Sequence, residues 1–143
     1  MSRYDMTPDE AHAFLQRGTF TGKLATVRAD GSPHVAPIWF VLDGDDLIFT
    51  TGRDTVKGRN LTRDPRVSIS IDDQTPPYSF ITIFGTATIS EDLDEMLVWA
   101  TKIGERYMGA DKAEAFGKRN AVDGELLVRV KVTKQIAQKD LSN

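Results

Sequence analysis

Alternating apolar and polar positions over residues 23–51 predict β-strands rather than helices. Two dipeptides interrupt the alternation, Asp30-Gly31 and Asp43-Gly44. Such pairs tolerate the positive φ angles that tight hairpin turns require. This segment is therefore predicted to form three strands connected as a meander.

The same alternation returns in three later segments. Residues 66–72 place three apolar side chains on one side of a strand, and residues 78–89 form a longer strand in which Gly85 indicates a bulge or bend. Residues 125–137 alternate valines with charged side chains, which is typical of a strand with one wet face. Six strands are expected in total.

Helical patterns precede and separate these strands. Thr7, Pro8 and Glu10 have the spacing of a capped helix start, and Ser90 can cap a longer helix. Asp54 or Thr55 can cap a shorter one. Helices are predicted at residues 8–17, 54–63, 90–108 and 111–119.

No linker or low-complexity segment divides this order of elements, so one domain spanning residues 1–143 is expected. A small antiparallel sheet is expected to close, or nearly close, into a barrel, because closure removes exposed strand edges. The predicted fold class is α+β, a six-stranded antiparallel barrel with peripheral helices.

The overall charge argues against a general nucleic-acid binder. The chain has a net charge of −3 and a pI near 5.4, whereas nucleic-acid binders carry a basic excess over a whole face. It contains no cysteine, which suits a reducing compartment. No signal-peptide core and no apolar run of membrane-spanning length is visible. We expect a cytoplasmic protein with neither a membrane nor a nucleic-acid partner.

Familiar catalytic motifs are missing from the sequence. Residues 51–58 lack the Gly-Lys-Ser/Thr ending of a phosphate-binding P-loop, and neither a Rossmann glycine motif nor a serine nucleophile elbow occurs. Two histidines without cysteines make a zinc site improbable, and the acidic run from Asp43 lacks the glycine of a calcium loop. We predict no metal site and no catalytic side chain, so an enzyme of this sequence would depend on an organic cofactor.

One short connection departs from the acidic balance. Residues 50–66 carry five basic and two acidic side chains, a net charge of +3, so the rest of the chain carries −6. A charge run of this kind is more often a solvated face than a binding site. Helical spacing over residues 54–63 nevertheless places Arg53, Lys57 and Asn60 on nearly one side.

The start of this predicted helix would offer free backbone N–H groups and a positive dipole end to an anion. Thr50 and Thr51, at the end of the preceding strand, could add hydroxyl donors. The residues therefore predict a pocket for a phosphate or carboxylate at the strand-to-helix junction.

Three stretches resemble a known family: ADGSPHVAPIWFVLDGD, TTGRDTVKGRNLTRDPRVSISIDD and a strand ending in FGTATI. Their order is similar to that of the pyridoxamine-phosphate-oxidase-like split β-barrels, and more narrowly to the actinobacterial flavin/deazaflavin oxidoreductases that use coenzyme F420. The resemblance covers roughly residues 11–132. Its strongest part is K-x-R-N-L-x-R-D-P-R, which runs from Lys57 to Arg66.

The resemblance implies a split β-barrel homodimer with F420 in grooves at the subunit interface. The residues that it implies for the tricyclic ring are Pro37, Ile38 and Trp39. Those that it implies at or beside the phosphate-bearing tail are Thr50, Thr51, Val56, Lys57, Gly58 and Asn60. The second subunit would contribute Tyr78, Ser79 and Ile81.

Three functions stay open from the sequence. The first is an F420-dependent reductase that passes a hydride to an unsaturated or quinone-like small molecule. The second is an oxidoreductase that uses flavin mononucleotide (FMN) on the same barrel. The third is a non-enzymatic binding protein for F420, haem or a related tetrapyrrole, because fold does not settle function. In each case the apolar strands APIWFVL and FITIF favour a dimer, since the few small helices predicted could hardly cover both faces of the sheet.

Overall fold

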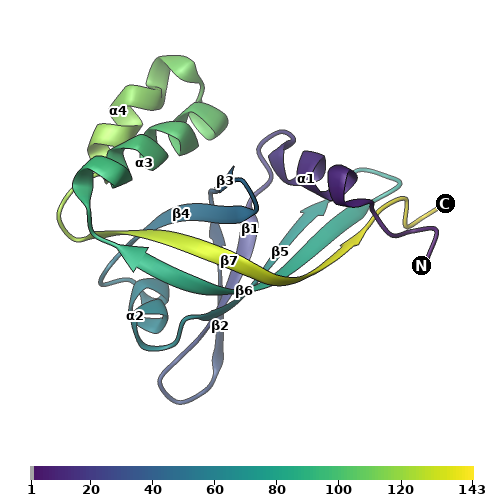
Figure 1. Cartoon of the computed structure of the whole chain (residues 1–143), viewed down its shortest axis with the longest axis horizontal. Helices are drawn as coiled ribbons and strands as arrows, with labels where there is room; N and C mark the ends of the chain where they lie inside the picture. The colour runs from purple at the N-terminus through teal and green to yellow at the C-terminus, as the bar shows by residue number, and fades with distance from the viewer. Residues whose placement is uncertain (1) are drawn as a thin grey trace.

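Seven antiparallel strands form one continuous sheet in the computed structural model, which describes residues 2–143. In chain order they are β1 (Gly22–Val27), β2 (Pro33–Ile38), β3 (Val41–Asp43), β4 (Asp46–Gly52), β5 (Arg66–Asp73), β6 (Ser79–Ser90) and β7 (Glu125–Gln138). Their order across the sheet is β2-β1-β5-β6-β7-β4-β3. The α+β class is confirmed. The sheet is curled but not closed, because β2 and β3 remain as edge strands (Figure 1). The expected count of six strands is wrong, since the sheet has seven.

The extra strand arises because the predicted second strand breaks at Trp39 and Phe40. Both backbone polar groups of Phe40 bond to helix side chains: its N–H donates to the Tyr107 hydroxyl at 3.2 Å, and its carbonyl accepts from Arg106 Nη1 at 2.8 Å. The Tyr107 hydroxyl in turn donates to the Phe20 carbonyl at 2.8 Å. No glycine or proline stands at positions 39–40, so the break is imposed by tertiary contacts.

The helices are α1 (Pro8–Gln16), α2 (Val56–Arg63), α3 (Leu93–Met108) and α4 (Ala110–Asn120). The predicted capping box of α1 is confirmed, since Thr7 and Glu10 exchange side-chain to backbone hydrogen bonds. The cap of α3 is Asp92 rather than Ser90. Figure 1 shows the α3–α4 hairpin at one end of the sheet and α1 at the other, beside both termini. None of the helices formed by residues 2–143 is both long and apolar enough to cross a lipid bilayer.

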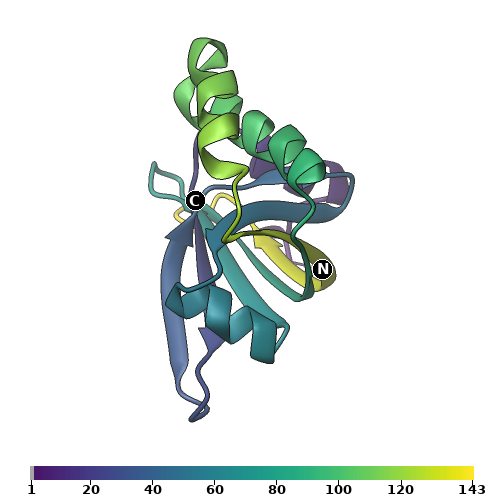
Figure 2. The same cartoon turned by 90° about the vertical axis from the view of Figure 1, so that its left-hand side faces the viewer.

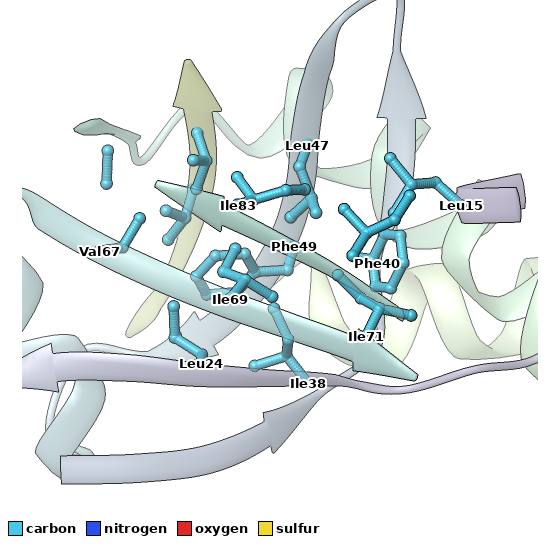
Figure 3. Packing of buried hydrophobic residues seen from close by; sticks show 14 of the residues in the cluster. Leu15, Leu24, Ile38, Phe40, Leu47, Phe49, Val67, Ile69, Ile71 and Ile83 are labelled. Atoms are coloured by element: carbon cyan, nitrogen blue, oxygen red, sulfur yellow. The ribbon is translucent and has the colours of Figure 1, made fainter. Parts of the chain in front are cut away.

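The main core fills the concave side of the sheet. Fully buried side chains from neighbouring strands converge there, among them Leu24, Phe49, Ile69 and Ile83 (Figure 3). Burying a side chain of this size contributes about 1.5–3 kcal/mol relative to leaving it in water. This cluster is the main source of stability for the strands that carry the candidate site.

The predicted bulge at Gly85 is confirmed. The pairing of β6 with β7 changes register between Phe84 and Gly85. A Cβ on Gly85 would lie 2.5 Å from the Lys131 carbonyl oxygen, so the two backbones approach too closely for any side chain here.

Arg106 joins α3 to two other parts of the chain. Its guanidinium donates to the carbonyls of Leu15 at 2.8 Å and Gly18 at 3.0 Å, in addition to that of Phe40. The carbonyls of Leu15 and Gly18 lie at the end of α1 and in the turn that follows it, whereas Phe40 lies at the strand break. Half-burial lowers the pKa of Arg106, because desolvation disfavours its charge, but the group stays protonated at neutral pH.

Replacing Arg106 by methionine is expected to lower the free energy of unfolding by about 2–4 kcal/mol, because three carbonyls lose a charge-assisted partner. Urea denaturation followed by circular dichroism measures the change. The matched control is Arg119→Met on the exposed side of α4, which should cost less than about 0.5 kcal/mol. Equal effects of the two substitutions would contradict a role for Arg106 in fixing the strand break.

Candidate functional site

The junction between β4 and α2 is built around the hydroxyl of Thr55, the N-cap residue of α2. Thr55 Oγ1 accepts a hydrogen bond from the Gly58 N–H at 3.1 Å and donates to the Gly52 carbonyl at 2.8 Å. Thr51 Oγ1 lies 3.1 Å from Thr55 Oγ1 and acts as the donor, since the single Thr55 proton is already used. Thr55 thus fixes where α2 begins. It was one of two caps considered from the sequence, but it was not among the predicted site residues.

Gly58 allows the first turn of α2 to lie directly on the end of β4. A Cβ at this position would stand 2.2 Å from the Gly52 carbonyl oxygen and 2.9 Å from that of Arg53. No other residue fits without moving the backbone. The predicted site residue Gly58 therefore has a clear steric role, which is to bring the helix start close to the strand end.

Two backbone donors face outward at this helix start. Within the described residues, the N–H groups of Val56 and Lys57 have no hydrogen-bond partner, as expected for the first turn of a helix. The half-buried Lys57 side chain belongs to the same turn and forms no ion pair with residues 2–143. The combination of two amide donors, an ammonium group and the positive end of α2 suits a phosphate or carboxylate.

Two of the four other basic side chains of the connection are paired with carboxylates. Arg53 bonds Glu91 and lies 3.7 Å from Asp123, and both carboxylates raise its pKa. Arg66 bonds Asp64 at 2.7 Å and lowers the pKa of that carboxyl to about 2. The basic run is therefore in part a solvated, ion-paired face. Like Arg59 and Arg63, Lys57 pairs with no carboxylate among the described residues, but Lys57 is half-buried in the first turn of α2, whereas Arg59 is exposed and Arg63 donates to the Val27 carbonyl.

Asn60 lies beneath α2 rather than at its open end. Its side chain is only 3% exposed, its amide donates to Thr26 Oγ1 at 3.0 Å, and its carbonyl oxygen accepts from Arg63 at 3.1 Å. Thr26 pairs across the sheet with His34, whose Nδ1 is buried without a partner among the described residues. In this structure the amide of Asn60 holds α2 to the sheet.

Thr50 and Thr51 point to opposite faces of β4. Thr51 is nearly buried on the inner face, where it reaches Thr55. Thr50 pairs with Leu127 on the face that α3 covers. The alternation of a strand separates the two hydroxyls, so the structure brings Thr51 but not Thr50 to the start of α2.

Glu125 is a charged residue at the junction that the sequence analysis missed. It is the cross-strand partner of Gly52. A Cβ placed on Gly52 would lie 3.7 Å from Glu125 Oε1 and 3.2 Å from Thr55 Cγ2, so both side chains lie near the same face of this glycine. Partial burial raises the pKa of Glu125, and the nearby Lys57 ammonium opposes this rise. A carboxylate therefore faces the start of α2.

The predicted ring-binding residues lie where β2 ends. Pro37 is exposed on the edge strand, while Ile38 is buried in the core. Trp39 is 39% exposed, and its ring stacks on Tyr107 with centroids 4.9 Å apart, beside Phe116 of α4 at 5.6 Å. Trp39 thus presents part of a firmly held aromatic ring to solvent.

The third predicted group lies far from α2 within one chain. Tyr78 has a φ of 65° and is 44% exposed in the turn before β6, Ser79 begins that strand, and Ile81 is fully buried in the core. The eight residues of β5 separate this turn from the end of α2, which at about 3.3 Å per residue is roughly 25 Å. Figures 1 and 2 place α2 beside the β1–β2 hairpin, away from this turn. A single chain does not assemble the three groups.

A cavity of about 300 Å³ lies between α1 and the β3–β4 hairpin. Its floor includes Leu47 and Ile83, and His12 and Asp45 stand at its lining. None of the predicted cofactor residues contributes to it. Residues 2–143 also contain no cluster of three or more His, Cys, Asp or Glu side chains that could hold a metal ion.

Comparison with known proteins settles the family. Residues 7–136 match the family described as pyridoxamine 5'-phosphate oxidase. The chain belongs to this family. The family is one of oxidoreductase-like split barrels, in agreement with the curled, open sheet.

Two solved structures of this pyridoxamine 5'-phosphate oxidase fold extend the comparison. A conserved hypothetical protein of Mycobacterium tuberculosis superposes with a TM-score of 0.87 and 25% identity, covering 99% of this chain and 90% of that one. A protein described as an F420 reductase superposes with a TM-score of 0.68 and 31% identity, covering 86% of this chain and 94% of that one.

A curated relative matches over a shorter segment. The 5a,11a-dehydrotetracycline/5a,11a-dehydrooxytetracycline reductase of Streptomyces rimosus is 43% identical over 56 residues, which is 36% of this chain and 39% of that reductase. The match therefore spans well under half of the relative.

Replacing Glu125 by glutamine is expected to stabilise the protein at neutral pH. Because folding raises the pKa of Glu125, its contribution to stability is fully present below the unfolded value, near 4.3, and is lost as the pH rises through the folded value. The melting temperature of the variant should exceed that of the parent at pH 7.5, and the gap should shrink as the pH falls to 4. A gap that does not change with pH would contradict the raised pKa.

Proposed function

We propose that this protein is an F420-dependent reductase that transfers a hydride from the reduced deazaflavin coenzyme to an unsaturated or quinone-like small molecule. The observation that carries the proposal is the start of α2, where two amides without partners lie in the same turn as the half-buried Lys57. The 31% identity to a protein described as an F420 reductase, and the shorter match to the 5a,11a-dehydrotetracycline/5a,11a-dehydrooxytetracycline reductase, support a reductase of this kind.

The residues present fit the phosphate of such a coenzyme. The amides of Val56 and Lys57 and the side chain of Lys57 can each donate one hydrogen bond to it, while Thr55 holds the turn in place. Gly58 keeps this turn close to β4. The bound coenzyme supplies the hydride, and the chain's own residues supply binding and orientation.

Trp39 is the candidate for the wall along which the tricyclic ring lies. Its indole is fixed by Tyr107 and Phe116 and remains partly open to solvent. A fixed aromatic wall can orient the ring and hold the acceptor against it with little loss of side-chain entropy. No side chain is assigned as a proton donor, and solvent can supply the proton.

The groove is completed by a second copy of the chain. Tyr78 and Ser79 lie too far from α2 to meet the same ligand within one protomer, so the proposal takes them from the partner. The outer face of β2, β1, β5 and β6 is available for this pairing. Its side chains include Val35, which is 62% exposed, and the cross-strand series Ala25, Ser68 and Phe84.

Replacing Lys57 by alanine is expected to weaken F420 binding by roughly ten- to more than a hundredfold, because one charge-assisted hydrogen bond is worth about 1.5–3 kcal/mol. Fluorescence titration with F420, beside a titration with FMN, measures the change. Lys112→Ala on the exposed start of α4 is the control and should bind as the parent does. A folded Lys57→Ala variant with parental affinity would remove α2 from the proposed site.

A homodimer is expected at micromolar concentration, because the outer sheet face leaves several apolar side chains uncovered by any helix of the described chain. Multi-angle light scattering measures the mass directly. Val35→Glu, on the edge strand of this face, should shift the equilibrium toward monomer and also weaken F420 binding. A monomeric parent protein that still binds F420 would contradict the shared groove.

A further inference from the structure

The carboxylate of Glu125 changes the charge that the α2 junction offers to a ligand. It stands at the first residue of β7, directly across from Gly52, and faces the side of the junction that carries the Thr55 side chain. The neighbouring backbone is fixed as well, since the Arg53 N–H donates to the Gly124 carbonyl at 2.8 Å. Glu125 is therefore held close to any anion bound at the start of α2.

The unpaired positive charge at this junction is small. Arg53 is already balanced by Glu91 and Asp123, and the unpaired Arg59 is exposed to solvent farther along α2. The helix start itself therefore offers the +1 of the Lys57 ammonium and the positive end of the helix, which has an effective charge of about +0.5. Glu125 subtracts one unit from this sum. The junction thus carries close to half a positive charge, which suits a singly charged anion better than a doubly charged one.

We propose that Glu125 makes the α2 junction selective for a singly charged phosphodiester against a doubly charged phosphate monoester. The inference deepens the proposed function and rests on it, because F420 contains a phosphodiester whereas FMN carries a phosphate monoester. A phosphate monoester has its second pKa near 6 and is mostly doubly charged at pH 7.5. Glu125 therefore repels FMN about twice as strongly as it repels the phosphate of F420.

The expected size of the effect follows from Coulomb's law. For charges about 7 Å apart at a partly solvated site, with an effective dielectric constant of about 40–80, one pair of like charges changes an affinity by about three- to sevenfold. Removing the charge of Glu125 should thus raise F420 affinity by about three- to sevenfold. The gain for FMN should be the square of that factor, about ten- to fiftyfold.

Fluorescence titrations of the full chain and of Glu125→Gln with F420, FMN and riboflavin, at pH 7.5 and low salt, test the proposal. Glutamine keeps the size of the side chain, and riboflavin has no phosphate, so its affinity should not change. The preference for F420 over FMN should fall by about three- to sevenfold in the variant. The control is Glu105→Gln on the exposed side of α3, which removes the same charge away from α2 and should leave the preference as it is.

If the parent binds F420, the selectivity of Glu125 would be overturned, and the proposed function left intact, by equal factors for F420 and FMN in Glu125→Gln or by no change for either. An equal gain for riboflavin would also overturn it, because the phosphate would then not be the group that is repelled. A parent protein that binds no F420 would overturn the proposed function itself, and the inference with it.

Discussion

The close approach of Gly58 to the Gly52 carbonyl is the constraint on which the candidate site depends. Because no Cβ fits between them, the first turn of α2 lies on the end of β4, and its amides open at the rim of the sheet. Thr55 then fixes the direction of the turn through bonds to both glycines. The proposed anion-binding character of the site is thus a backbone property, which side chains adjust: Lys57 adds a positive charge and Glu125 a negative one.

A second constraint, at the other side of the sheet, determines why the barrel stays split. Arg106 and Tyr107 remove the backbone of Phe40 from the ladder, so the chain leaves β2 and starts β3 on the far side. The same tyrosine holds Trp39 against α3. The break therefore leaves two sheet edges and at the same time presents an aromatic ring where β2 ends. The proposed homodimer would use both features.

Much of this fold could be predicted from local signals. The α1 capping box, the Gly85 bulge and the cap at Thr55 depend on residues close in sequence, and each is present. The break at Phe40 could not be predicted, because its cause lies on α3, 66 residues or more away. For the same reason, the sequence pattern of residues 35–42 predicted one continuous strand.

The candidate site was predictable to a similar degree. The helix start and Lys57 follow from the sequence of one connection, whereas Glu125 reaches the junction only through the pairing of β4 with β7. The roles of Asn60 and Thr50 also depend on tertiary structure, which places the first beneath α2 and the second under α3. A charge count along the chain could not separate Lys57 from arginines that distant carboxylates neutralise, such as Arg53.

The most direct measurement is a crystal structure of the protein with F420. The account predicts the coenzyme phosphate within hydrogen-bonding distance, about 2.7–3.2 Å, of the Val56 and Lys57 amides, with the deazaflavin ring beside Trp39 and the partner's Tyr78 near the same groove. A phosphate bound elsewhere, for example in the cavity beside His12, with the start of α2 facing only water, would contradict it.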